Sequence, residues 1–364
     1  MIAVGVLVAA VLGGVVGRDL SQPQLPVVSQ TTPTSPTSVP SGAPTNAAAI
    51  ASEVDPALVD INTVISAESV EGAGTGMVLT STGEVLTNNH VVEGANKISV
   101  TDVGNGKTYD ATVVGYDRTQ DVAVIQLVGA SGLTTVTTGN SSNASVGTGV
   151  VAIGNANGAG GTPTPAAGTI TATNQSITAS DEVDGSSEQL SGLLESDCNI
   201  VAGDSGGPLV DTSGKVLGMD TAASSGFQFE SSSTQGYSIP INTALGLAKQ
   251  IEAGSASNTV HVGPTAFLGV GVRDATNGSP FGGGSSSGTG AEVVQVVAGE
   301  PAANAGLTIG DVITSLGGHT VTSADDLTNV MTTEKPGATV SVVFVDTSGQ
   351  SQSAQITLAS GPPQ

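Results

Sequence analysis

The chain has 364 residues, enough for two domains with flanking segments, and its single cysteine, Cys198, rules out an internal disulfide. It carries 8 Lys and Arg against 31 Asp and Glu, and the net charge of −23 argues against a nucleic-acid partner, because such a surface repels phosphates. With 51 glycines and many short runs of Val, Ile and Leu, the composition favours a turn-rich all-β fold.

The N-terminal part of the chain predicts export. Residues 2–16 form an apolar run shorter than the roughly 20 residues of a membrane span, and we interpret residues 1–18 as a signal or membrane-anchor segment. No Lys or Arg precedes the run and no clear A-x-A site follows it, so cleavage and anchoring are both open. Residues 19–46 are rich in Pro, Ser and Thr and predict a linker.

The next segment, residues 47–255, alternates short strand-like runs with turns rich in Gly, Asn, Asp and Ser, a spacing typical of a β-barrel or sandwich. A helix is predicted over residues 241–254, ending at Gly254. The predicted strands are residues 59–65, 76–80, 84–88, 111–117, 122–127, 149–154, 168–173, 207–211 and 215–221.

A second unit, residues 264–360, follows a hinge-like SASN stretch and again consists mainly of short strands. It contains two helix candidates, residues 300–307 and 323–333. In the later one, Ser323 is the predicted N-cap and the first turn is acidic, which suits the helix dipole. The unit is therefore predicted to be a small α+β domain.

The segment with the most chemical information is GDSGGP at residues 203–208. A serine hydroxyl is a weak nucleophile at neutral pH, so it needs a base, together with hydrogen-bond donors where charge develops on a substrate carbonyl. Glycines around Ser205 allow a tight turn in which the N–H groups of Gly203, Asp204 and Ser205 converge on one point. We therefore predict a catalytic serine with an oxyanion hole.

A histidine should supply the base, and the sequence contains three. His261 lies between the two units, and His319 lies in a Gly-Gly-His-Thr turn of the second unit. His90 follows the strand-like run of residues 84–88 and is the predicted base by elimination.

The third member of such a site is an acid that fixes the imidazole tautomer. Asp121 opens an apolar strand-like run, where its carboxylate can be buried at a barrel rim, and it is the predicted acid. Asp117 is the competitor. It precedes Arg118 and can equally pair with that side chain at the surface.

Three segments resemble the signature regions of HtrA proteases within the chymotrypsin-like group. They are TGMVLTSTGEVLTNNHVV around His90, YDRTQDVAVIQL around Asp121, and DCNIVAGDSGGPLVDTSGKVLGM around Ser205. The resemblance covers roughly residues 47–255 and includes the chain order His, Asp, Ser. It implies a chymotrypsin-like double six-stranded β-barrel, so the expected fold class is all-β dominated, with a trypsin-like protease domain first.

The C-terminal unit resembles a PDZ domain, in AFLGVGV (266–272), residues 291–321, the following helix and ATVSVVFV (338–345). In PDZ domains a peptide adds as a strand, and loop N–H groups hold its terminal carboxylate. The resemblance implies peptide binding by Phe267, Leu268, Gly269 and Val270. Leu327 and Met331 either line the same pocket or pack in the core.

Two positions near the nucleophile depart from the pattern. Asp204 stands where HtrA proteases usually carry Asn, and Asn199 stands where trypsin-like enzymes keep an acidic residue at the base of the S1 pocket. Arg or Lys at the cleaved position is therefore not favoured, and the resemblance implies small to medium apolar residues there. Cys198 is predicted to be a buried small hydrophobe. The expected S1 residues are Asn199, Ile200, Thr221, Ala222 and Ala223.

These features predict an extracytoplasmic serine endopeptidase, membrane-anchored or secreted, that acts on misfolded or exported proteins while its PDZ domain binds C-terminal peptides. No cofactor or metal is expected, because neither GAGTG (72–76) nor GNANGAGG (154–161) opens a nucleotide-binding βαβ unit. The sequence leaves the oligomeric state open. The resemblance implies a possible homo-oligomer, but the N-terminal aromatic residues through which the family often trimerises do not occur before Tyr109.

Two alternative functions, a chaperone-like or peptide-binding protein and an esterase, would leave different sequence features. A chaperone-like or peptide-binding envelope protein with minor proteolysis would be marked by a damaged triad, whereas all three residues are present here. An esterase would need a strand-turn-helix context around the serine, and its acid would lie between the serine and the histidine in chain order.

Overall fold

A computed structural model describes residues 42–65, 70–181, 187–221, 227–229, 235–275 and 289–363. The predicted signal or anchor segment, residues 1–18, and most of the predicted linker lie outside the described residues. Among the residues described, no helix has both the length and the apolar character needed to cross a bilayer. The first element is helix α1 (Ala47–Val54), which continues into the 3-10 turn η1 (Asp55–Ala57).

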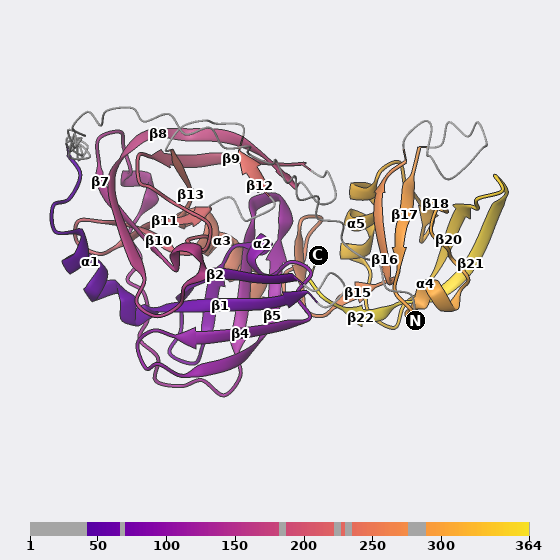
Figure 1. The fold of residues 1–364 in the computed structure, drawn as a ribbon, viewed down its shortest axis with the longest axis horizontal. Helices are drawn as coiled ribbons and strands as arrows, with labels where there is room; N and C mark the ends of the chain where they lie inside the picture. The colour runs from indigo at the N-terminus through magenta and orange to yellow at the C-terminus, as the bar shows by residue number, and fades with distance from the viewer. Residues whose placement is uncertain are drawn as a thin grey trace, which may run out of the picture. The chain divides into compact units, whose positions relative to one another are not determined.

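The first six strands form a closed barrel. Their order is β5-β4-β1-β2-β3-β6, and pairing of β5 with β6 closes the ring. Figure 1 labels β1, β2, β4 and β5 of this barrel. A seventh strand, β14, adds to β5 from outside the ring. The bounds are β1 (Leu58–Ile65), β2 (Val70–Val78), β3 (Glu84–Thr87), β4 (Lys97–Asp102), β5 (Thr108–Asp117), β6 (Val122–Leu127) and β14 (Val260–Val262).

A second closed barrel follows. Its order is β8-β7-β10-β11-β13-β9, pairing of β8 with β9 closes the ring, and β12 adds to β8. The bounds are β7 (Gly149–Gly154), β8 (Thr164–Asp181), β9 (Ser187–Ser196), β10 (Pro208–Asp211), β11 (Val216–Thr221), β12 (Phe227–Phe229) and β13 (Gly236–Pro240). The expected double six-stranded barrel is therefore confirmed, with one additional strand on each ring.

Strand β6 shows why its sequence is continuously apolar rather than alternating. Val122 and Val124 belong to the core that the two barrels share with α1 and α3 (Ile241–Glu252). Ala123 and Ile125, on the opposite face, belong to the interior of the first barrel. Both faces of the strand are buried, so the pattern of period two that marks a half-exposed strand is absent. Asp121 immediately precedes this strand and therefore lies at the boundary between these two cores.

The helix predicted over residues 241–254 is α3, and the glycine that ends it, Gly254, has a φ of +68°. The shorter helical segments are α2 (Asn89–Val92), η2 (Arg118–Gln120), η3 (Ser141–Asn143) and η4 (Ala156–Gly158). α2 directly follows β3, and η2 joins β5 to β6, so both lie at the end of the first barrel where the candidate triad residues occur.

The C-terminal unit is the expected small α+β domain. Five of its strands form a sheet in the order β16-β17-β18-β20-β21, β19 pairs with β18, and β15 pairs with β22. The Ser323 side chain accepts a hydrogen bond from Asp326 N at 3.0 Å, which confirms the predicted N-cap of α5. The bounds are β15 (Thr265–Phe267), β16 (Val270–Asp274), β17 (Ala291–Val296), α4 (Pro301–Asn304), β18 (Val312–Leu316), β19 (His319–Thr320), α5 (Ala324–Thr333), β20 (Thr339–Val345), β21 (Ser351–Thr357) and β22 (Ala359–Gly361).

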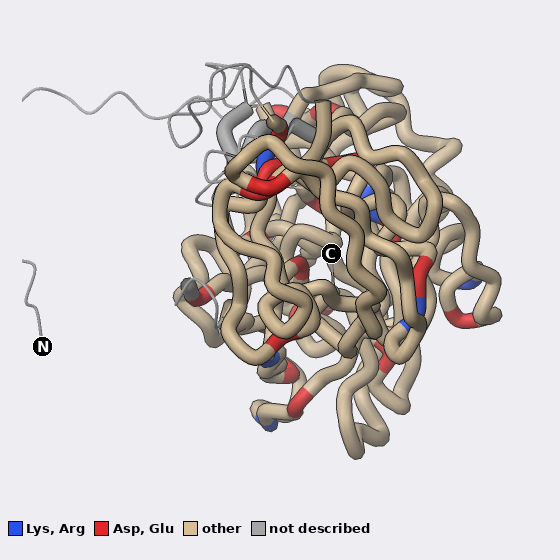
Figure 2. The backbone as a smooth tube through the Cα atoms, turned by 90° about the vertical axis from the view of Figure 1, so that its right-hand side faces the viewer, with Lys and Arg blue, Asp and Glu red and all other residues tan. Residues whose placement is uncertain are grey.

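The acidic residues do not form one patch. In Figure 2 the Asp and Glu positions are dispersed along the tube, and the few Lys and Arg positions lie among them. Within the described part of the chain, no group of three or more His, Cys, Asp and Glu side chains is placed to hold a metal ion. In this view the acidic positions are therefore distributed along the described chain rather than gathered in one segment.

Candidate active site

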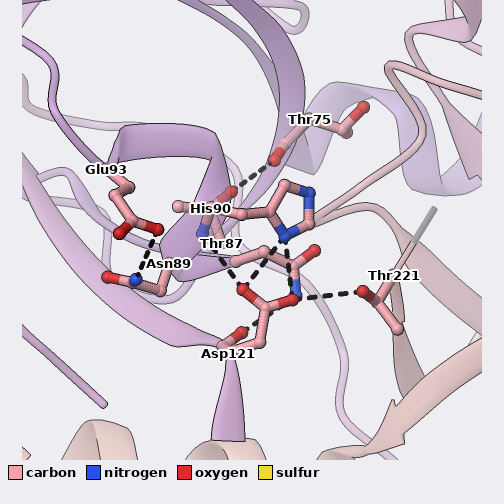
Figure 3. Close-up of polar contacts among 8 residues, drawn as sticks. Thr75, Thr87, Asn89, His90, Glu93, Asp121 and Thr221 are labelled. Atoms are coloured by element: carbon pink, nitrogen blue, oxygen red, sulfur yellow. Dashed lines mark hydrogen bonds and ion pairs between the residues drawn. The ribbon is translucent and has the colours of Figure 1, made fainter. Parts of the chain in front are cut away.

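His90 and Asp121 are joined by their side chains. His90 Nδ1 lies 3.0 Å from Asp121 Oδ1 and 2.9 Å from Oδ2, and the backbone N–H of His90 donates to Oδ1 at 3.0 Å (Figure 3). Asn88 Nδ2 donates to the backbone oxygen of Asp121 at 2.9 Å. The acid is 2 % exposed, and its φ of +52° aims it back toward α2. The imidazole is thus held by its Nδ1 edge.

Thr221, at the end of β11, completes the surroundings of the acid. Its hydroxyl donates to Asp121 Oδ2 at 3.1 Å (Figure 3). The carboxylate therefore receives donors on both oxygens, which fixes its plane against the imidazole. Thr221 was expected as a wall of the S1 pocket. Its hydroxyl also holds the acid, and its place in the S1 pocket stays a prediction.

Ser205 lies in the turn before β10 and belongs to the same cluster. Its backbone oxygen accepts from Thr75 N at 2.8 Å, which places it beside β2 of the first barrel. The following residue, Gly206, donates its N–H to Asp220 O at 2.9 Å. Asp220 directly precedes Thr221, the residue that holds Asp121. The structure therefore brings the turn that carries Ser205 next to the histidine–aspartate pair.

Of the three N–H groups expected to form an oxyanion hole, that of Asp204 has a partner within its own turn. The N–H of Asp204 donates to Val201 O at 3.0 Å, so it closes the turn and does not converge with its neighbours. The carbonyls of Ala202 and Asp204 accept hydrogen bonds from Asn157 N at 2.6 Å and Gly207 N at 2.8 Å. Because the C=O and N–H of a trans peptide point in opposite directions, these contacts aim the N–H groups of Gly203 and Ser205 the other way.

The carboxyl group of Asp204 is buried without a cation. Its Oδ2 accepts from Val201 N at 2.9 Å, while Oδ1 packs against the backbone at Gly154. Burial raises the pKa of Asp204 to about 6. Asp220 is fully buried, and burial, reinforced by the charge of Asp204 and opposed by the Ser238 hydroxyl, raises its pKa well above the ordinary value. Two acids with raised pKa values therefore lie beside the turn that carries Ser205.

Cys198 is buried in a small apolar cluster with Val150 and Leu209. Burial raises the pKa of its thiol to about 12, so the reactive thiolate is absent at neutral pH. The prediction of a small buried hydrophobe is confirmed.

The competing residues lie elsewhere. His319 is exposed in β19, while His261, in β14, places Nε2 3.1 Å from Gly263 O, so neither contacts Asp121. Asp117 is buried, and its carboxylate caps η2 by accepting from Gln120 N at 3.2 Å. The carboxylate of Asp117 also accepts from Thr119 Oγ1 at 2.7 Å, so it faces its own turn.

Arg118 lies near Glu93, the residue that caps the C-terminal end of helix α2. Its Nε lies 3.8 Å from Glu93 Oε1. The reason is geometric: η2 turns consecutive side chains in different directions, so Asp117 points toward its own backbone while Arg118 points toward the neighbouring segment.

The remaining S1 candidates are only partly within the described residues. Ala222 and Ala223 lie outside them. Asn199 is exposed, and the Ile200 side chain covers Gly236, where an added Cβ would lie 2.5 Å from Ile200 Cδ1. Ile200 therefore occupies the space above the start of β13.

The C-terminal domain contains a small cavity of about 60 Å³ between β16 and α5. It brings together all six residues that the sequence singled out in this domain. Leu327 and Met331 are 3 % and 5 % exposed and also belong to the domain core, so both interpretations of these two residues hold. The lining residues are Ala266, Phe267, Leu268, Gly269, Val270, Val272, Leu327, Thr328 and Met331.

Three residues that the sequence did not mark as functional hold the turn that carries Ser205. Thr75 lies in the GAGTG segment, and Asn155 and Asn157 lie in GNANGAGG. The sequence gives Thr75 no role beyond its place at the start of the TGMVLT segment, and it gives Asn155 and Asn157 none beyond a glycine-rich loop that opens no nucleotide-binding unit. A signal was present, because glycines flanking one polar residue mark places where backbones approach closely.

Comparisons with known proteins identify two domains in the chain. Residues 74–219 match the trypsin-like peptidase domain, and residues 266–358 match the PDZ domain. The serine protease PepD of Mycobacterium tuberculosis is 34 % identical over 324 residues, covering 85 % of this chain and 65 % of PepD. The periplasmic pH-dependent serine endoprotease DegQ of Escherichia coli is 31 % identical over 278 residues, covering 75 % of this chain and 56 % of DegQ.

A solved structure, the HtrA-type protease AlgW with tripeptide, shows 28 % identity and a TM-score of 0.48 and covers 87 % of this chain and 98 % of AlgW. The chain spans less than two thirds of the length of the curated relatives named above. With a trypsin-like peptidase domain followed by a PDZ domain, the chain belongs to the HtrA-type serine proteases.

Proposed function

We propose that this chain is a serine endopeptidase in which Ser205 is the nucleophile, His90 the general base and Asp121 the acid that orients the base. The observation that carries the proposal is the contact of His90 Nδ1 with both carboxylate oxygens of Asp121, at 3.0 and 2.9 Å. It joins two residues 31 positions apart, beside the turn that holds the serine.

The geometry supports the following steps. With the Nδ1 proton directed at Asp121, the neutral imidazole accepts the Ser205 hydroxyl proton at Nε2 while Oγ forms a bond to the substrate carbonyl carbon. The N–H groups of Gly203 and Ser205 stabilise the oxyanion. His90 then donates its proton to the leaving amine as the C–N bond breaks. The same imidazole then takes a proton from water as the water oxygen bonds to the acyl carbon, and it gives that proton to Ser205 Oγ as the acyl C–Oγ bond breaks.

The same proposal includes a preference for small to medium apolar side chains at the cleaved position. Two observations support it: position 199 is Asn and carries no carboxylate, and the apolar Ile200 side chain covers Gly236. The substrates are then misfolded or exported proteins outside the cytoplasm. The apolar run of residues 2–16 and the periplasmic relative DegQ support this location.

The test is covalent labelling of the full chain with a fluorophosphonate, followed by peptide mapping. We expect one labelled residue, Ser205, and parallel loss of casein cleavage as labelling proceeds. Ser205→Ala should take up no label, and Ser213→Ala, in an exposed turn, should label normally. Absence of both labelling and casein cleavage in the folded wild-type chain would reject the protease function for this chain.

For the PDZ domain we propose binding of C-terminal peptides in the cavity between β16 and α5. Val272, on β16, lines this cavity, and Val294, on β17, is exposed and does not. Val272→Asp is expected to weaken binding of a fluorescent peptide ending in Val at least tenfold (about 1.4 kcal/mol), because a carboxylate would face an apolar residue. Val294→Asp is the matched control, and equal affinities of the two variants in fluorescence polarisation would contradict the assignment.

A further inference from the structure

Thr75 makes four hydrogen bonds around the nucleophile's turn. Its hydroxyl accepts from Asn155 N and donates to Gly203 O, each at 2.8 Å. Its backbone N–H donates to Ser205 O at 2.8 Å, and its backbone oxygen accepts from Thr87 Oγ1 at 2.8 Å. The residue is completely buried in β2. One side chain of the first barrel thus contacts two separate loops of the second.

The loop that begins at Asn155 controls the other side of Gly203. Asn155 Oδ1 accepts from Gly160 N at 2.6 Å, which keeps the loop compact around η4. Asn157, within η4, donates its N–H to Ala202 O at 2.6 Å. Both peptide planes that flank Gly203 are therefore held, one by Asn157 and the other by Thr75.

Gly203 needs this support. Its φ is +93°, and glycine adopts positive and negative φ values about equally readily. The backbone alone therefore does not determine the direction of the Gly203 N–H. An added Cβ at Gly203 would collide with the backbone of Asn155 and Gly158, which shows how closely the loop packs on it. Holding both flanking carbonyls fixes φ and ψ and keeps the N–H aimed at the oxyanion position.

We propose that the Thr75 hydroxyl is a positioning group for the oxyanion hole: by bridging Asn155 N–H and Gly203 C=O, it sets the orientation of the Gly203 peptide groups. The proposal rests on the proposed function of Ser205 as nucleophile. Thr75 does not touch the substrate. Its hydroxyl acts through the turn and through the loop that supplies Asn157.

The test compares Thr75→Val, which keeps the shape and removes the hydroxyl, with Thr75→Ser, which keeps the hydroxyl. Thr75→Val leaves a buried N–H and a buried C=O without a partner, so the turn relaxes. We expect kcat on a fluorogenic peptide to fall about 10- to 100-fold with KM within about threefold, because the oxyanion forms only after substrate binding. Thr75→Ser should recover most of kcat.

A second readout separates positioning from general destabilisation. A peptide boronic acid forms a tetrahedral adduct that places an oxygen in the oxyanion hole, so its affinity should fall in parallel with kcat in Thr75→Val. Thr63→Val is the control, because Thr63 is a buried threonine of β1 paired with Gly72 and Ile98, away from the turn. It should keep kcat and boronate affinity within about threefold.

Each outcome decides the question. Wild-type kcat in Thr75→Val, a loss confined to KM, or an equal loss in Thr63→Val would overturn the inference. If Thr75→Val does not fold, Thr75→Cys replaces it, since a thiol is a weaker donor, and kcat should then decrease from Thr to Ser to Cys. An inert wild-type chain would reject the proposed protease function, whereas an active wild type with an unaffected Thr75→Val would reject only the role of Thr75.

Discussion

Asp121→Asn is expected to lower kcat about 10⁴-fold without unfolding the protein. Asp121 accepts from His90 Nδ1, His90 N and the Thr221 hydroxyl. An amide has only one acceptor oxygen, so its NH₂ group must face one of these donors. If it faces Nδ1, the imidazole carries its proton on Nε2 and cannot accept the serine proton. Asn tolerates the positive φ of this position, so the backbone is kept.

The matched control is Asp117→Asn. Asp117 is as buried as Asp121 and precedes it by four residues, but its carboxylate accepts from Thr119 Oγ1 and Gln120 N rather than from His90. Asn is also a good N-cap, so η2 should be retained. We expect kcat within a few-fold of wild type in steady-state assays on a fluorogenic peptide, with unfolding temperatures compared for both variants. Equal losses in the two variants would mean that Asp121 is not the orienting acid.

Asp204→Asn is expected to stabilise the folded protein at pH 8 and to have no such effect near pH 3. Burial raises the pKa of Asp204 from 3.8 to about 6, so the folded state binds the proton more tightly than the unfolded state does. The free energy of unfolding of the wild type therefore decreases as pH rises from about 4 to about 6 and is constant above. At about 1.4 kcal/mol per pH unit, ionisation of the buried Asp204 carboxyl costs the folded state about 3 kcal/mol. Solvent screening lowers this cost, so we expect Asp204→Asn to gain about 2 kcal/mol in the free energy of unfolding at pH 8.

The control for this prediction is Asp211→Asn, for which the expected change in stability at pH 8 has the opposite sign. Burial alone would raise the pKa of Asp211, but hydrogen bonds from Ser213 and Lys215 outweigh it and lower the pKa below 3.8. Its ionised form is favoured in the folded state, so Asp211→Asn should lose stability at pH 8, and the loss should vanish at low pH. Urea unfolding of both variants at pH 3 and pH 8 measures the two slopes. A gain for Asp204→Asn that does not depend on pH would show that relief of a buried charge is not its cause.

The sequence by itself predicted the residues whose signal is local. GDSGGP marks the nucleophile's turn, and the small number of histidines leads to His90 by elimination. Asp121 stands at the start of a continuously apolar strand, and Ser323 precedes an amphipathic acidic helix start. In each case the informative neighbours lie within a few residues, so turn chemistry, capping and periodicity are sufficient.

Tertiary structure decided the contacts between segments far apart in the chain. Thr75 reaches Gly203 across 128 positions and Asn155 across 80, and Thr221 reaches Asp121 across 100. Such hydrogen bonds depend on how the two closed barrels pack on each other, and no periodicity within a strand encodes that packing. The same reason explains why Asp204 N–H, expected in the oxyanion hole, instead closes its own turn: the direction of each peptide group is set by which carbonyls the neighbouring loop holds.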